Sequence, residues 1–160
     1  VVSQAMTISG HRNLLRRHTP AGYAALQQSW ADERLRLAAG APPRLVAAFG
    51  EDSESVRFQA ARPAAERTGW RNEVTLRTWE LYDEYEPAAS IARIAPTPLL
   101  MIVALGDTMT PAEDALDAYQ RALEPKRLVT VPGSHYAVYT DRFAETAGAA
   151  RDWFVAHLRP

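Results

Sequence analysis

The feature that most constrains the fold is the continuous apolar run LLMIVAL, residues 99–105, which lies between the segment PTP and Gly106. A run without polar positions is typical of a strand buried on both faces of a parallel sheet. A second run, KRLVTV at 126–131, ends at a Pro-Gly pair and predicts a neighbouring strand. The intervening residues 112–123 carry apolar side chains at helical spacing. Strand, helix and strand in this order predict a βαβ unit with parallel pairing.

Two helix starts are predicted around this unit. Thr110 precedes Pro111 and stands three residues before Glu113, which is the pattern of a capping box with proline at the first helical position. Thr140 is expected to cap a closing helix. The apolar side of that closing helix is expected to consist of Phe143, Ala147, Ala150, Phe154 and Leu158.

The rest of the chain divides into an apolar start and a helix-rich middle. Residues 1–7 predict a further buried strand. Pro20 fits the first turn of a helix that ends before Gly40. Residues 74–85 show mostly helical spacing and are followed by Pro87, where a helix commonly stops.

Composition excludes several classes of function. With 160 residues the chain has the length of one domain, and its formal net charge of −1 gives no electrostatic basis for binding nucleic acid or anionic membranes. The absence of cysteine excludes disulfides, thiolate metal sites and cysteine nucleophiles. No stretch reaches the roughly 18 apolar residues of a membrane span, and no signal peptide is recognised. We therefore expect a cytoplasmic protein without a cofactor or metal, and the abrupt apolar start predicts a chain cut from a longer one.

Two titratable residues follow the two strands of the predicted βαβ unit. Asp107 comes directly after the first strand, and His135 follows the Pro-Gly pair after the second. In open parallel sheets, catalytic groups gather beyond the carboxyl ends of the strands. A carboxylate there fixes the tautomer of a histidine and stabilises the imidazolium that forms when it takes a proton. The sequence therefore predicts that Asp107 and His135 form an acid–histidine pair. The other histidines, His11, His18 and His157, are expected at the surface.

The same residues carry a family resemblance. The segments D-x-x-x-P from Asp107 to Pro111 and PGSHY around His135 resemble the acid loop and the histidine loop of the α/β-hydrolases. VVSQAMTISG and NEVTLRTWELYDEYEPAASIARIAPTPLLMIVA are similar to bacterial members of the dienelactone-hydrolase and X-Pro-peptidase-like groups. The resemblance implies the C-terminal portion of a doubly wound, mainly parallel α/β sheet. In that arrangement residues 1–10 and 88–160 form the core, and residues 11–87 form a helical lid or cap.

The nucleophile of this family is missing from the sequence. α/β-Hydrolases run serine, acid, histidine in chain order, with the serine on a G-x-S-x-G turn. None of the serines of this sequence has one glycine two residues before it and another two residues after it. These serines are Ser3, Ser9, Ser29, Ser53, Ser55, Ser90 and Ser134. The oxyanion hole depends on the residue after the nucleophile and on an earlier loop. We therefore expect the nucleophile and the oxyanion hole to lie before Val1.

The leading hypothesis is the C-terminal part of a serine hydrolase that acts on a small-molecule ester or amide through an acyl-enzyme. The candidates for lining its acyl or leaving-group site are Met6, Ile8, Trp70, Trp79, Tyr82 and Tyr136, for each of which core packing is the simpler interpretation. An open apolar sheet edge further predicts pairing with an N-terminal half, on the same or a separate chain, or self-association. The alternative is a non-catalytic hydrolase-like remnant that serves in binding or oligomerisation. A third interpretation is an enzyme of this fold that works without serine, such as a lyase.

Overall fold

The computed structural model describes residues 1–66 and 69–158, which divide into two compact units. The sheet unit consists of Val1–Ser9 and Glu86–Pro160, and the helical unit consists of Gly10–Tyr85. Among the described residues, no helix combines the length and the apolar character that crossing a membrane requires.

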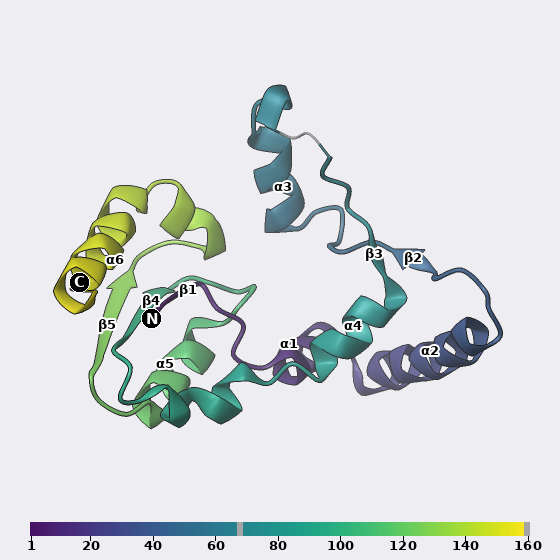
Figure 1. Cartoon of the computed structure of the whole chain (residues 1–160). Helices are drawn as coiled ribbons and strands as arrows, with labels where there is room; N and C mark the ends of the chain where they lie inside the picture. The colour runs from purple at the N-terminus through teal and green to yellow at the C-terminus, as the bar shows by residue number, and fades with distance from the viewer. Residues whose placement is uncertain (67–68, 159–160) are drawn as a thin grey trace. The chain divides into compact units, whose positions relative to one another are not determined.

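The sheet unit is built on three parallel strands in the order β1-β4-β5 (Figure 1). The central strand β4 (Leu99–Ala104) is buried at all six positions, as its unbroken apolar sequence predicts. It pairs with β1 (Val2–Gln4) on one side and with β5 (Lys126–Val131) on the other. β1 is shorter than the predicted strand over residues 1–7. It ends at Gln4, because the φ of 45° at the next residue, Ala5, lies outside the range of extended backbone.

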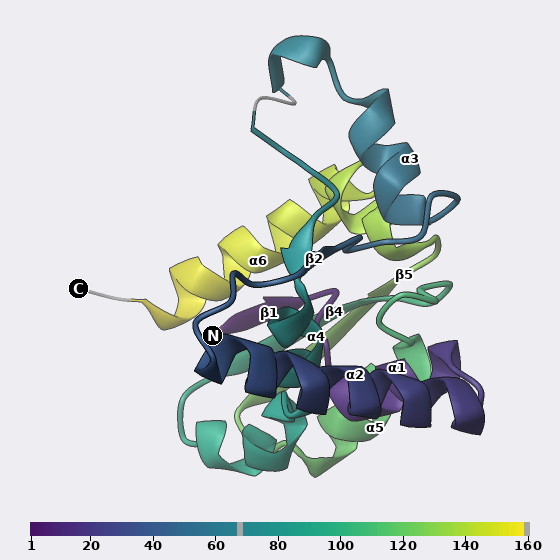
Figure 2. The same ribbon diagram turned by 90° about the vertical axis from the view of Figure 1, so that its right-hand side faces the viewer.

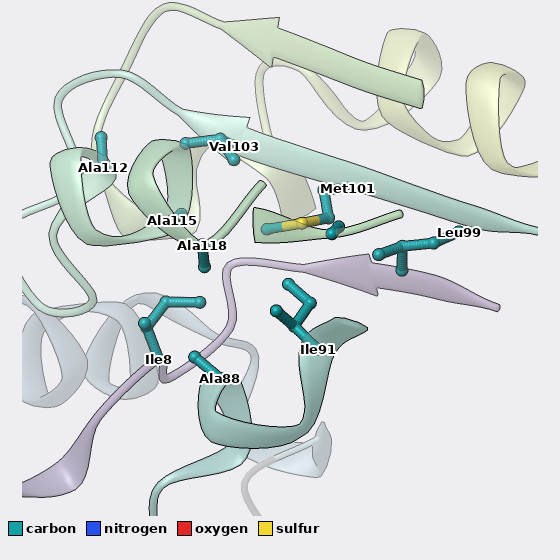
Figure 3. Packing of buried hydrophobic residues seen from close by; sticks show 10 residues of the cluster. Ile8, Ala88, Ile91, Leu99, Met101, Val103, Ala112, Ala115 and Ala118 are labelled. Carbon is teal, nitrogen blue, oxygen red and sulfur yellow. The ribbon is translucent and has the colours of Figure 1, made fainter. Parts of the chain in front are cut away.

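Helices cover both faces of this sheet because successive side chains of a strand point to opposite sides. Leu99, Met101 and Val103 of β4 pack against α5 (Ala112–Arg121) and the 3₁₀ segment η2 (Pro87–Ile94) (Figure 3). The alternate residues of β4 pack against α6 (Phe143–His157), which lies on the other face (Figure 1). The order β4, α5, β5 with parallel pairing confirms the predicted βαβ unit.

The predicted starts of α5 and α6 are both wrong. Pro111 is itself the N-cap of α5, and no side chain caps that helix, because the Thr110 hydroxyl donates to Asp107 instead. Arg142 is the N-cap of α6, and the Thr140 hydroxyl donates to the carbonyl of Tyr136.

The predicted apolar face of α6 is also wrong for its large residues. Phe143 is 58% exposed, Phe154 41% and Leu158 69%. The helix instead buries Thr146 and Trp153, and the small residues Ala149 and Ala150 pack against the apolar cluster to which Trp153 belongs. The small alanines allow α6 to approach the sheet, and the Thr146 hydroxyl bonds to the carbonyl of Val138 at 2.9 Å. These contacts fix the rotation of the helix.

The helical unit packs three helices around one apolar cluster. The helices α1 (Gly10–Arg17), α2 (Pro20–Ala38) and α4 (Leu76–Asp83) lie together around a cluster of Leu14, Tyr23, Trp30 and Leu76 (Figure 2). The predicted helix from Pro20 to the residues before Gly40 is confirmed, and the Thr19 side chain caps it.

The remaining elements of the helical unit are short. β2 (Leu45–Val46) pairs antiparallel with β3 (Val74–Thr75), and α3 (Glu54–Ala61) is followed by η1 (Ala64–Glu66). The helix predicted over residues 74–85 is therefore correct only in its middle. Its first two residues form β3, because they pair with β2, and the amide of Leu76 continues this contact by donating to the carbonyl of Arg44, just before β2.

Candidate active site

The carboxyl ends of β4 and β5 hold two loops together. Beyond β4, the amide of Leu105 donates to the carbonyl of Val131 and that of Gly106 donates to the carbonyl of Gly133, each at 2.9 Å. A Cβ on Gly106 would stand 2.8 Å from the carbonyl oxygen of Gly133, closer than real Cβ contacts. Gly133 has a φ of +118°, which favours glycine. The two glycines thus allow the loops to run in direct backbone contact.

These loops bring Asp107 and His135 together. Nδ1 of His135 lies 2.8 Å from Oδ2 of Asp107, although 28 positions separate the two residues in the sequence. The carboxylate side chain is 2% exposed and the imidazole 14%. An ionic hydrogen bond in such a poorly hydrated position is stronger than the same bond at the surface.

Asp107 is held by more than its contact with His135. Its Oδ1 accepts hydrogen bonds from the amides of Met109 and Thr110, both at 2.8 Å. Its Oδ2 accepts the hydroxyl proton of Thr110 at 2.7 Å, in addition to the bond from His135. Burial raises the pKa of Asp107. This effect is outweighed by the hydrogen bonds from His135 and from the amide and hydroxyl of Thr110, together with the charge of His135, all of which lower the pKa. The net effect lowers the pKa, so Asp107 is ionised at neutral pH.

The ionised carboxylate fixes the tautomer of His135. A carboxylate only accepts hydrogen bonds, so the nitrogen that faces it must carry the hydrogen. Nδ1 is that nitrogen, and Nε2 of the neutral ring therefore holds a free electron pair that can take a proton. The arrangement is that of a general base oriented by an acid.

Two aromatic rings lie near the imidazole. His135 opens the 3₁₀ segment η3 (His135–Tyr139), and its ring lies 4.9 Å from that of Tyr136, edge to face. The ring of Tyr139 lies 6.5 Å from it, centroid to centroid. These contacts restrict rotation of the imidazole and reinforce its orientation by Asp107.

Of the predicted lining residues, the structure brings Tyr136 to His135. Met6 and Ile8 pack in the core of the sheet unit (Figure 3 shows Ile8). Trp79 and Tyr82 pack against the cluster of the helical unit. Trp70 is 40% exposed on the helical unit.

Two of the serines that lack the G-x-S-x-G pattern, and the three remaining histidines, also have defined surroundings. The Ser9 hydroxyl donates to Glu86 at 2.5 Å, and the Ser53 hydroxyl accepts from the amide of Val56 as the cap of α3. His11, His18 and His157 are exposed, which confirms the prediction for them. Within residues 1–66 and 69–158, no three His, Asp or Glu residues are grouped closely enough to hold a metal ion.

Sequence reasoning missed the part that Thr110 takes in this site. It assigned the residue to the start of α5, whereas the hydroxyl contacts Asp107 and lies 3.3 Å from Nδ1 of His135. The signal that pointed to this contact is the spacing of Asp107 and Thr110, since side chains commonly bond to backbone and side-chain groups two or three residues on.

Comparison with known proteins identifies the fold. No family model matches the sequence. The uncharacterized protein YfhR of Escherichia coli K12 is 35% identical over 66 residues, which cover 41% of this chain and 23% of that protein. Its counterpart in Escherichia coli O157:H7 is 28% identical over 121 residues, or 65% of this chain and 42% of that protein. The chain thus spans less than half the length of these curated relatives.

Solved structures match nearly the whole chain. DcsB, in complex with its substrate analogue, has a TM-score of 0.82 and 17% identity, and the match covers 98% of this chain and 57% of that one. The α/β hydrolase GrgF from Penicillium sp. sh18 has a TM-score of 0.75, 20% identity and coverage of 98% and 54%. A monoacylglycerol lipase of Paleococcus ferrophilus has a TM-score of 0.65, 15% identity and coverage of 98% and 58%. The chain therefore has the α/β fold, with a mainly parallel sheet, of the α/β hydrolases, as its sequence predicts.

Proposed function

We propose that this chain supplies the acid and the histidine of a serine α/β-hydrolase that cleaves a small-molecule ester or amide. The observation that carries the proposal is the 2.8 Å contact between Asp107 and His135 at the carboxyl ends of neighbouring parallel strands. The fold neighbours support the general class, since a protein named monoacylglycerol lipase is among them. Membership of the dienelactone-hydrolase or X-Pro-peptidase-like group stays a prediction.

The chemistry follows from the two nitrogens of His135. Nε2 takes the proton of the nucleophilic hydroxyl as its oxygen attacks the carbonyl carbon, and then gives that proton to the leaving alcohol or amine. A water molecule then completes the cycle: Nε2 takes its proton as the water oxygen attacks the acyl carbon, and returns that proton to the nucleophile's oxygen as the bond to the acyl group breaks and the acid leaves. Asp107 stays ionised throughout, holds the Nδ1 hydrogen and stabilises the imidazolium.

The nucleophile in this proposal is a serine of a G-x-S-x-G turn, carried by polypeptide outside residues 1–160. The sequence lacks that motif, and the match with the solved structures covers only 54–58% of their lengths. The remaining polypeptide is the N-terminal half of the fold, on the same or a separate chain. It would also supply the donors of the oxyanion hole and cover the outer edge of β1.

The helical unit is proposed as the lid. It is inserted in the sequence between β1 and η2, and it has an apolar cluster of its own. Trp70 is the predicted lining residue that it exposes most clearly. Apolar aromatic side chains accept many acyl groups, so this unit would set the preference among substrates.

A fluorophosphonate probe tests this proposal in the intact protein. We expect stoichiometric labelling of a serine outside residues 1–160, at a rate that His135→Ala lowers at least about 100-fold. Residues 1–160 expressed alone should remain unlabelled and should hydrolyse p-nitrophenyl esters at the background rate. Labelling of a serine within this chain would contradict the proposal. An intact, folded protein that is neither labelled nor active would favour the alternative, a non-catalytic binding or oligomerisation module.

A further inference from the structure

Thr110 forms a closed triangle with the two residues of the pair. Its Oγ1 lies 2.7 Å from Oδ2 of Asp107 and 3.3 Å from Nδ1 of His135, while Nδ1 and Oδ2 are 2.8 Å apart. The amide of the same threonine bonds to the other oxygen of Asp107 at 2.8 Å. One residue thus holds both oxygens of the carboxylate.

The hydrogens of this triangle can be assigned. Asp107 is an ionised acceptor, so the single hydroxyl proton of Thr110 lies on the bond to Oδ2. The lone pairs of Oγ1 remain for Nδ1 of His135, which carries a hydrogen. Both oxygens near Nδ1 therefore accept from it, and neither can donate to it.

The position of Thr110 in the chain provides an independent observation. Thr110 stands where the sequence T-x-x-E predicts a helix cap, yet α5 begins with no side-chain cap bond. The hydroxyl is given to Asp107 instead. A hydrogen bond from Thr110 to Asp107 thus takes the place of the side-chain cap that would stabilise the start of α5.

We propose that Thr110 is a positioning residue of the candidate active site, whose hydroxyl turns Oδ2 of Asp107 toward Nδ1 of His135 and keeps it there. The proposal rests on the proposed function, in which that pair orients the general base. It gives Thr110 no contact with the substrate and no step of its own.

The variant Thr110→Val tests the hydroxyl alone, because valine keeps the branched shape and the backbone amide. Thr110→Ser restores a hydroxyl, and Thr97→Val is the matched control at an exposed threonine of the sheet unit. In the folded chain, carbon-13 NMR of the carboxyl group follows the titration of Asp107. We expect Thr110→Val to raise the pKa of Asp107, because the Thr110 hydroxyl is one of the bonds that lower it, whereas Thr110→Ser and Thr97→Val leave it unchanged.

Kinetics of ester hydrolysis in the intact protein form the second arm. Thr110→Val should lower kcat about 10-fold with KM unchanged, since only the orientation of the base changes, and Thr110→Ser should stay within about twofold of wild type.

The two arms separate the possible failures. The proposal would be overturned if Asp107 titrates in Thr110→Val as it does in the wild type. It would also be overturned if Thr110→Val raises the pKa of Asp107 but keeps the wild-type kcat, while His135→Ala is inactive. Unchanged hydrolysis in His135→Ala would instead overturn the proposed function.

Discussion

Replacing Asp107 by asparagine removes the charge from the acid with almost no change of shape. The carboxylate accepts four hydrogen bonds: two amides on Oδ1, and the Thr110 hydroxyl and the His135 ring on Oδ2. The introduced asparagine side chain would keep its oxygen on the two amides and would place its NH₂ group where Oδ2 now lies. That NH₂ group donates, so Nδ1 of His135 would have to accept.

The substitution would prevent His135 from acting as the general base. When Nδ1 accepts, the hydrogen of the neutral ring moves to Nε2, which can then take no proton from the nucleophile. A general base contributes about 10²–10⁴-fold to the rate, and the wrong histidine tautomer costs about 10⁴-fold in a Ser-His-Asp triad. We therefore expect Asp107→Asn to lower kcat by about 10³–10⁴-fold, or roughly 4–5.5 kcal/mol in the barrier.

The assay combines kinetics with NMR. Hydrolysis of a p-nitrophenyl ester by the intact protein gives kcat, and nitrogen-15 shifts of His135 give the tautomer in the folded chain. Asp117→Asn is the matched control, because that carboxylate is 56% exposed and pairs with Arg121 at the surface. An Asp107→Asn variant with wild-type kcat, or with the hydrogen still on Nδ1, would refute the reasoning.

Three further predictions concern the loops and the helical unit. Gly106→Ala should destabilise the fold by about 1–3 kcal/mol and lower activity, because its Cβ would press on the carbonyl of Gly133, and urea unfolding measures the change. Glu33, whose pKa is lowered to about 2 chiefly by its bond to the amide of Arg44, should stabilise the fold at neutral pH. Because the folded pKa is depressed, the advantage over Glu33→Gln should shrink as pH falls from about 4.3 toward about 2, as thermal unfolding would show. Burial and Asp83 raise the pKa of Tyr23 to about 12, so absorbance should show a late tyrosine titration that Tyr23→Phe removes.

The strands β4 and β5 could be predicted because short stretches of sequence define them. An unbroken apolar run can be satisfied by burial on both faces, and the breaks at Gly106 and the Pro-Gly pair mark where the strands end. The positions of Asp107 and His135 follow from those strand ends. Their placement in the sequence is therefore enough to pair them.

The rotation of α6 was not predictable because its sequence offers several faces. Alanines occur on most sides of the helix, so the spacing of Phe143 and Phe154 was as compatible with burial as that of Trp153. The choice depends on tertiary contacts, namely the bond from Thr146 to Val138 and the packing of Trp153 on the sheet. Such contacts override a pattern that has no single strong stripe.

The role of Thr110 was missed because two local interactions compete for one hydroxyl. A helix cap contributes about 1 kcal/mol, whereas a hydrogen bond to a charged group contributes about 1.5–3 kcal/mol. The Thr110 hydroxyl therefore bonds to the carboxylate of Asp107 and does not cap α5. The sequence contained both partners, but it did not show that the carboxylate is buried and ionised.

The measurement that tests the central claim most directly is ester hydrolysis by His135→Ala in the intact protein. His18→Ala is its control, since that histidine is exposed on the helical unit. If His135 is the general base, its variant should lose at least about 100-fold in kcat while His18→Ala keeps the wild-type value and both keep the wild-type circular dichroism spectrum. A folded His135→Ala variant that hydrolyses the ester at the wild-type rate would contradict the account.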